Sequence, residues 1–145
     1  MFSHILIPTD GSPLATYAVD KGIEFARDTN ARITVITVTE PFHLVSADPD
    51  QIRNTRIEYE KFARTEGARA LSDAELKAKQ VGVPYQSVQV ESNEPFRAII
   101  DACERHNCDL IMMASHGRRG VSALLLGSVT QKVLTHSRIP VLVYR

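Results

Sequence analysis

Five short apolar segments, separated by longer segments with helical spacing, constrain the fold of this chain most. Four of them are rich in apolar or β-branched residues and too short for ordinary helices, which is typical of buried strands. The segments span residues 2–8, 33–38, 84–90, 109–114 and 139–144. Strands that alternate with helices predict a parallel sheet, because each helix returns the chain to the same end of the sheet. We therefore expect an α/β fold with a single open five-stranded parallel sheet, helices on both faces, a Rossmann-like architecture and the strand order 3-2-1-4-5.

Local signals give the expected bounds of the first two helices. Ser12 followed by Pro13 predicts a helix start, with Ser as the N-cap and Pro at the first helical position, and Asn30 is placed to close that helix. After a loop over 40–50, a long helix is expected over 51–80, and its charges of both signs indicate a solvated face. Its expected inner stripe is Ile52, Tyr59, Ala63, Gly67, Ala70, Ala74 and Ala78.

The other two helices flank the fourth strand. Ser92 or Asn93 is expected to cap the third helix, which carries Pro95 in its first turn. Its apolar face is expected to hold Phe96, Ile99, Ile100 and Cys103. The fourth helix is expected over 121–136, with Leu125, Val129 and Val133 in line. The strand over 84–90 alternates polar and apolar residues and is therefore expected near a sheet edge.

Composition narrows the functional classes. The chain has 145 residues, 17 Lys plus Arg and 17 Asp plus Glu, so its formal net charge is zero, which disfavours a duplex nucleic-acid binder. No apolar run approaches the roughly 20 residues that span a bilayer, and the N-terminus lacks the pattern of a secretory signal. Cys103 and Cys108 are not accompanied by a second pair, so we interpret them as reduced, buried thiols of a cytoplasmic single-domain protein and expect no zinc site.

Ligands of open α/β sheets bind at the carboxyl ends of the strands, where the strand order reverses. Three segments are expected to converge there: 8–12, 38–40 and 114–120, the last leading to Gly127-Ser128. Neither the dinucleotide fingerprint nor the P-loop occurs. What does occur is Ala-Ser-His-Gly, nine residues, then Gly-Ser. A glycine-rich loop that offers backbone N–H groups is a natural anion site, and the Ser128 hydroxyl adds a donor.

Over its whole length the chain resembles a single-domain universal stress protein. ATP-binding members of that family carry G-x-x-G, nine residues, then G-[ST] after the fourth strand, which here implies Gly117, Gly127 and Ser128, with a backbone contact from Val129 to phosphate. The opening ILIPTDGS is similar to the family's first-strand signature, whose aspartate faces the nucleotide, here Asp10. Val38 matches the position whose backbone meets adenine.

The resemblance implies ATP as the cofactor, with or without Mg²⁺, and no metal site made by the protein alone. The site expected on this basis comprises Pro8, Thr9, Asp10, Val38, Met113, Ala114, Ser115, His116, Gly117, Arg118, Gly120, Gly127, Ser128, Val129 and Thr130. One residue departs from the pattern, because Ala114 replaces the first glycine of the motif. A requirement for positive φ there would make alanine cost about 1–2 kcal/mol, whereas a requirement for closeness alone would tolerate one methyl group.

Several of these residues also have structural interpretations. Asp10 could simply close an Asx-turn, and Gly117 and Gly120 could serve a strand-to-helix turn. Gly127 marks either close approach to a ligand or the true start of the helix, because a glycine inside a helix costs about 1 kcal/mol. His116 is expected to position groups, and the Arg118 side chain, like that of Arg119, either reaches phosphates or faces solvent. The four other histidines, His4, His43, His106 and His136, have no metal-ligand spacing and receive no role.

The final strand is apolar on both faces and is expected at an edge, where a long apolar strand must be covered or paired. The family's closing strand often forms a dimer, which here implies a homodimer through Ile139, Val141 and Val143. The leading functional hypothesis is a cytoplasmic stress-response module, homodimeric and regulated by adenine nucleotide. A slow ATPase and a nucleotide-free protein-interaction dimer, with Ala114 marking a lost site, are the alternatives.

Overall fold

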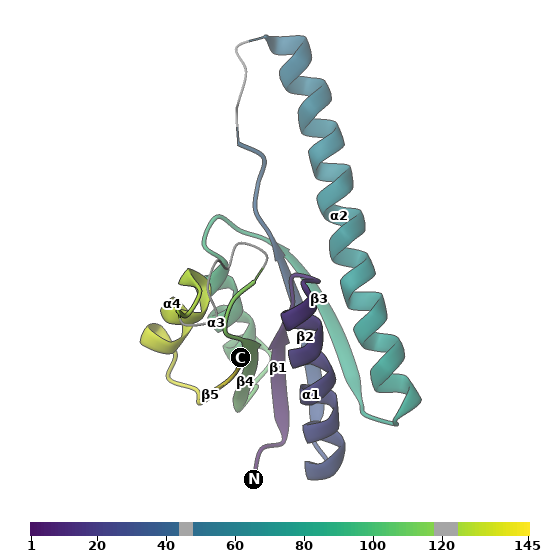
Figure 1. The fold of residues 1–145 in the computed structure, drawn as a ribbon, viewed down its shortest axis with the longest axis vertical. Coiled ribbons are helices and arrows are strands. Elements are labelled where there is room, and N and C mark those ends of the chain that lie inside the picture. Colours follow the sequence, from purple (N-terminus) through teal and green to yellow (C-terminus); the bar gives the residue numbers. More distant parts are fainter. Residues whose placement is uncertain (44–47, 118–124) are drawn as a thin grey trace.

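The computed structural model describes residues 1–43, 48–117 and 125–145 and contains the expected five-stranded parallel sheet in the order β3-β2-β1-β4-β5 (Figure 1). The elements along the chain are β1 (His4–Pro8), α1 (Pro13–Thr29), β2 (Arg32–Thr39), α2 (Pro49–Gln80), β3 (Tyr85–Glu91), α3 (Pro95–Arg105), β4 (Leu110–Ala114), α4 (Ser128–His136) and β5 (Val141–Tyr144). The predicted fold class and strand order are confirmed, and the alternating strand β3 lies at an edge as expected.

The helices cover the sheet in two pairs. α1 and α2 pack on one face and α3 and α4 on the other, as Figure 1 shows. Right-handed crossovers explain this arrangement, because the chain moves from β1 toward β3 over one face and then returns past β1 to β4 and β5 over the other. The strand order therefore reverses beside β1, and the ends of β1 and β4 form the switch point of the sheet.

The centre of the sheet is β1, which pairs with both β2 and β4. Ile5, Leu6 and Ile7 are fully buried, with Ile5 and Ile7 in the core cluster of the α1 and α2 face and Leu6 in the cluster of the α3 and α4 face. This alternation follows from the two-residue period of a strand. Burial of β1 on both faces fixes the position of the loop that follows it.

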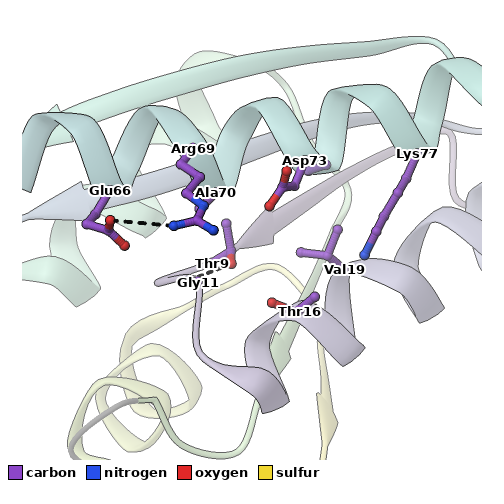
Figure 2. A pocket seen from close by; sticks show the side chains of 10 residues that line it. Thr9, Gly11, Thr16, Val19, Glu66, Arg69, Ala70, Asp73 and Lys77 are labelled. Atoms are coloured by element: carbon purple, nitrogen blue, oxygen red, sulfur yellow. Dashed lines mark hydrogen bonds and ion pairs between the residues drawn. The ribbon is translucent and has the colours of Figure 1, made fainter.

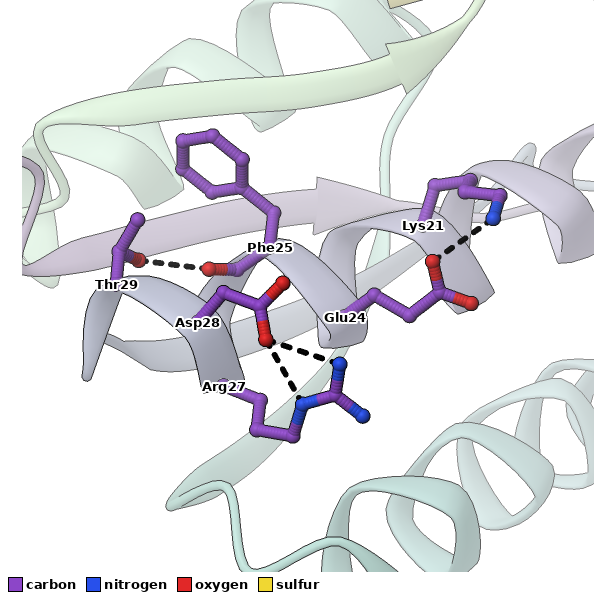
Figure 3. Close-up of polar contacts among 6 residues, drawn as sticks. All are labelled: Lys21, Glu24, Phe25, Arg27, Asp28 and Thr29. Atoms are coloured by element: carbon purple, nitrogen blue, oxygen red, sulfur yellow. Dashed lines mark hydrogen bonds and ion pairs between the residues drawn. The ribbon is translucent and has the colours of Figure 1, made fainter.

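The start of α1 matches its prediction. Ser12 is the N-cap, with its Oγ accepting from the N–H of Ala15 at 3.3 Å, and Asn30 ends the helix in the left-handed conformation at φ 58°. The exposed side of α1 carries ion pairs at 2.8 Å between Lys21 and Glu24 and 2.9 Å between Arg27 and Asp28 (Figure 3). Surface pairs of this kind contribute little to stability.

The expected starts of α2 and α3 were wrong. α2 begins at Pro49, inside the expected loop, because the side chain of Asp48 caps it by accepting from the N–H of Asp50 at 3.0 Å. For α3 the N-cap is Glu94, and the Ser92 Oγ accepts from the N–H of Glu94 at 3.1 Å. The expected face of α3 is largely confirmed: Ile99 and Cys103 are buried and Phe96 packs against the same cluster, while Ala102 is buried in addition.

The predicted inner stripe of α2 holds only for its second half. The buried residues are Gly67, Leu71, Ala74 and Ala78. The first half extends beyond the sheet, as Figure 1 shows, so Ile52 and Tyr59 have no core to enter. Tyr59 instead donates its hydroxyl to the carbonyl of Glu40 at 2.8 Å and packs against Phe42.

The prediction for α4 was also wrong at its start. The helix begins at Ser128, and Leu125, expected on its inner stripe, is 71% exposed. Gly127 is the N-cap at φ −63° and ψ 156°, which is extended backbone. The prediction that Gly127 marks the true start of the helix is therefore confirmed. Among the helices that the structure describes, none is long and apolar enough to cross a membrane.

Candidate functional site

The carboxyl ends of β1 and β4 lie close to the first turn of α4. We call this end of the sheet, where the strands finish, its carboxyl edge, and the opposite end its amino edge. The N–H of Gly127 donates to the carbonyl of Ser115 at 2.7 Å, and the buried Thr130 Oγ1 donates to the carbonyl of Ala114 at 2.9 Å. These two bonds hold the start of α4 against the end of β4. The first turn of the helix thus lies where a parallel sheet offers its ligand site.

A side chain at Gly127 would crowd the backbone of the loop after β4. Its φ is accessible to any residue, but an added Cβ would lie 3.1 Å from the Cα of His116 and 3.3 Å from the carbonyl oxygen of Ser115. Both neighbours belong to backbone, which cannot move aside easily. A glycine N-cap also makes no side-chain hydrogen bond to the first turn. The N–H groups of that turn are therefore not covered by a capping side chain, and the partial positive charge of the helix N-terminus is available to an anion.

The second close approach joins Asp10 to Gly117. The Oδ1 of Asp10 accepts from the N–H of Ser12 at 2.9 Å, so the Asx-turn interpretation is correct. The other oxygen, Oδ2, lies where a Cβ on Gly117 would stand. Asp10 therefore closes the turn and also packs its carboxylate against the loop after β4.

Ala114 is compatible with the backbone at its position. It lies in β4, is 8% exposed and packs with Ala15 and Ala18. The non-glycine residues with positive φ in the described chain are Asn30 and Asn107, so Ala114 pays no left-handed penalty. Of the two requirements considered for this position, the one for positive φ does not apply.

The remaining predicted residues surround this centre. The N–H of Ser115 donates to the carbonyl of Tyr144 at 2.6 Å, and the Ser115 Oγ lies 3.1 Å from the Nδ1 of His116. The sheet places four others. Pro8 pairs with Ile36, and the N–H of Thr9 donates to the carbonyl of Ile36 at 2.8 Å. The buried Met113 pairs with Val143, and the half-buried Val38 pairs with Val90. Ser128 and Val129 open α4. Arg118 and Gly120 lie outside the described residues.

A cleft of about 310 Å³ between α1 and α2 was not anticipated by the sequence analysis (Figure 2). Thr9 and Gly11 line it at one end, so it adjoins the predicted site. Its α2 wall includes Arg69, Asp73 and Lys77, and the Nζ of Lys77 lies 2.5 Å from Asp20 Oδ1. The charges of α2 were interpreted as a solvated face, and the cleft follows from the packing of α2 against α1, which helical periodicity does not specify.

Comparison with known proteins identifies the family. The sequence profile of the universal stress protein family matches residues 1–145. This chain belongs to the universal stress protein family. A universal stress protein of Thermus aquaticus is 32% identical over 147 residues, and the match covers all of both chains.

Two solved structures extend the comparison. A universal stress protein of Burkholderia pseudomallei has a TM-score of 0.73 and 28% identity, covering 99% of this chain and 96% of that one. Another universal stress protein, solved in complex with cAMP, has a TM-score of 0.70 and 23% identity, covering 99% and 97%. Within the residues that the structure describes, no group of three or more His, Cys, Asp or Glu side chains is placed to hold a metal ion in this universal stress protein.

Proposed function

We propose that this universal stress protein binds an adenine nucleotide, ATP, at the carboxyl edge between β1 and β4. The observation that carries the proposal is the pair of crowded glycines, Gly117 and Gly127. Neither has the positive φ that would by itself call for glycine, and a Cβ at either would meet neighbouring atoms. Glycines let backbone segments come close together, and beside a helix N-terminus this can form a loop whose N–H groups bind phosphate.

The chemistry of the surrounding groups fits the parts of the ligand. The phosphates would accept from the N–H groups of the first turn of α4, including that of Val129, and from the hydroxyl of Ser128. The carboxylate of Asp10 is an acceptor for ribose hydroxyls. Val38, half-buried at the end of β2, would offer backbone and apolar surface to adenine.

The relative solved with cAMP supports the ligand class in a limited way. That protein binds an adenine nucleotide, but at 23% identity the likeness shows the fold alone. The choice of ATP rests on the two glycines and Ser128 in this chain. Ala114 does not argue against it, because its backbone is unstrained.

The test is isothermal calorimetry with Mg-ATP and with AMP. We expect micromolar binding of ATP and at least tenfold weaker binding of AMP, because a phosphate cradle gains most from the terminal phosphates. Gly127→Val should weaken ATP binding by about five- to 150-fold, since crowding of backbone by a β-branched side chain costs about 1–3 kcal/mol and displaces the donors.

The control is Gly67→Val, which inserts the same side chain at a crowded glycine of α2 away from the site. There the added atoms meet side chains, those of Gln89 and Thr37, and not the backbone of the loop after β4, so folded Gly67→Val should retain the ATP affinity of the wild type. Circular dichroism confirms that each variant is folded. Absence of binding at millimolar ATP, or equal loss in both variants, contradicts the proposal.

We further propose that the protein acts in the cytoplasm as a homodimeric regulatory module that pairs through β5. Support comes from the edge position of β5, from its four half-buried residues and from Ile139, Val141 and Val143, which place apolar atoms along this edge. Cys103 and Cys108 are buried free thiols, consistent with a reducing compartment. Val143→Lys should convert a dimer to a monomer in sedimentation velocity, and a wild-type monomer at high concentration contradicts pairing.

A further inference from the structure

The amino end of the sheet carries a second cleft, of about 430 Å³. The beginnings of β1, β2 and β3 and the end of α3 build it, through His4, Arg32, Gln86, Arg105 and His106 among others. Strands β1 and β2 therefore connect this cleft to the opposite edge, where the nucleotide is proposed to bind. Nothing in the proposed function uses it.

The charged groups of this cleft are cationic. Arg32 and Arg105 are both exposed, and neither guanidinium takes part in an ion pair within the described chain. The nearby carboxylate of Asp109 is already occupied, since it accepts from the N–H of Ser3 at 2.9 Å, the Oγ of Ser3 at 3.0 Å and the N–H of His4 at 3.0 Å. Asp109 does not line the cleft.

A buried histidine anchors a hydrogen-bond network behind these arginines. His4 is 3% exposed, and its Nε2 lies 2.7 Å from the Oγ1 of Thr34, a fully buried hydroxyl. Burial, and then the positive charge of Arg32, lower the pKa of His4 below 6.5. A hydrogen bond to the backbone of His106 opposes this lowering, so the imidazole of His4 also ties the start of β1 to the end of α3.

The same network orients His106. The amide Nε2 of Gln86 donates to the Oγ1 of Thr34 at 2.8 Å and lies 3.1 Å from the Nδ1 of His106. Because the amide nitrogen is a donor only, Nδ1 of His106 is the acceptor, and the neutral ring carries its hydrogen on Nε2. No hydrogen bond to Nε2 of His106 is found among residues 1–43, 48–117 and 125–145, so this donor is available to a ligand beside the two arginines.

We propose that this cleft is a second ligand site, which binds the phosphate group of a small phosphate monoester through Arg32, Arg105 and His106. Guanidinium groups form paired, charge-assisted hydrogen bonds with phosphate oxygens, and two of them match a dianion. The cleft is larger than phosphate alone, and the exposed Pro84 and Tyr85 offer apolar surface to the organic part of the ligand.

Inorganic phosphate is the probe, titrated into ¹⁵N-labelled protein and followed by two-dimensional NMR. Sodium chloride at matched ionic strength is the reference. We expect saturable shifts of the amides of Arg32, His106 and Asn107 and of the side-chain amide of Gln86. Each of Arg32→Gln and Arg105→Gln should raise the phosphate dissociation constant about tenfold, the loss expected for one charge-assisted contact. Both side chains are exposed, so both variants should remain folded.

Two controls separate this site from the nucleotide site. Arg53→Gln removes the same charge from an exposed ion pair on α2 and should leave the titration unchanged. Gly127→Val should abolish any phosphate response around Ser128 and leave the response at the amino end intact, so either site can fail independently. Shifts that chloride reproduces, or that survive unchanged in both Arg32→Gln and Arg105→Gln, overturn the proposal.

Discussion

The two ends of the sheet differ in how each can attract an anion. At the carboxyl edge the groups are backbone N–H donors and crowded glycines around Gly127, whereas at the amino edge they are the side chains of Arg32, Arg105 and His106. The difference follows from chain direction. In a strand–helix–strand unit each helix begins at the carboxyl edge and ends at the amino edge, so partial positive charge gathers at the first and partial negative charge at the second. Backbone can bind phosphate at the carboxyl edge, while the amino edge needs full side-chain charges.

At each edge the hydroxyl of a buried threonine ties neighbouring elements together. At the carboxyl edge Thr130 is 2% exposed and bonds the carbonyl of Ala114, and at the amino edge Thr34 is fully buried and bonds both His4 and Gln86. Removal of each hydroxyl therefore allows the two edges to be compared. One bond depends on Thr130 and two on Thr34.

The largest effects are expected from replacing these threonines by valine. Thr34→Val should lower the free energy of unfolding by about 2–3 kcal/mol, because it removes the partner of both His4 Nε2 and the Gln86 amide. Thr130→Val should lower it by about 1–2 kcal/mol, because it removes one bond. Urea unfolding measures both. Thr130→Val should also weaken ATP binding in calorimetry, and Thr34→Val should leave it unchanged. Equal effects of both variants on ATP affinity would erase the distinction between the edges.

A double-mutant cycle tests the contact between Asp10 and Gly117 at the carboxyl edge. Gly117→Ala should cost about 1 kcal/mol in the wild-type background, since its methyl group would occupy the place of the Asp10 carboxylate. In an Asp10→Ala background the same substitution should cost almost nothing. Chemical denaturation of the four proteins gives the coupling, and additive costs would show that the carboxylate does not lie against Gly117.

His4, at the amino edge, should make the stability of the protein depend on pH. The pKa of His4 is lowered in the folded protein, so the unfolded chain binds the proton more tightly. Its contribution to stability is therefore complete above 6.5, the ordinary value, and is lost as the pH falls from there through the folded pKa. His4→Gln should remove this slope in urea unfolding between about pH 7.5 and about pH 5.

Another group titrates in a separate window. Hydrogen bonds from Ser3 and His4 lower the pKa of Asp109 below 3.8 against the opposing effect of burial, so its contribution is lost only in stronger acid. A slope above pH 5 that persists in His4→Gln would assign it to a different group.

The smallest effect is expected from Ala114→Gly. A glycine in strand β4 should cost about 1 kcal/mol of stability, and ATP affinity should change less than about threefold because alanine is unstrained there. Thermal unfolding and calorimetry measure the two quantities. A large rise in ATP affinity would instead favour the nucleotide-free dimer, with Ala114 marking a lost site.

The accuracy of the sequence predictions varied with the range of the signal. The caps at Ser12 and Asn30 were predicted correctly because each acts on its own turn. The start of α4 was not, because the bond from Gly127 to the carbonyl of Ser115 joins residues at opposite ends of a loop. Ile52 and Tyr59 have apolar spacing, yet the part of α2 that carries them extends past the sheet.

The sequence by itself determined the α/β class and the alternation of strands and helices, because strand and helix periods and caps are properties of neighbouring residues. Only the tertiary structure decided that Gly127 is an N-cap, that Ala114 is unstrained, and that His4, Arg32, Gln86 and His106 share a cleft. Those four residues come from β1, β2, β3 and the end of α3. Their proximity follows from sheet order and register, which long-range packing sets.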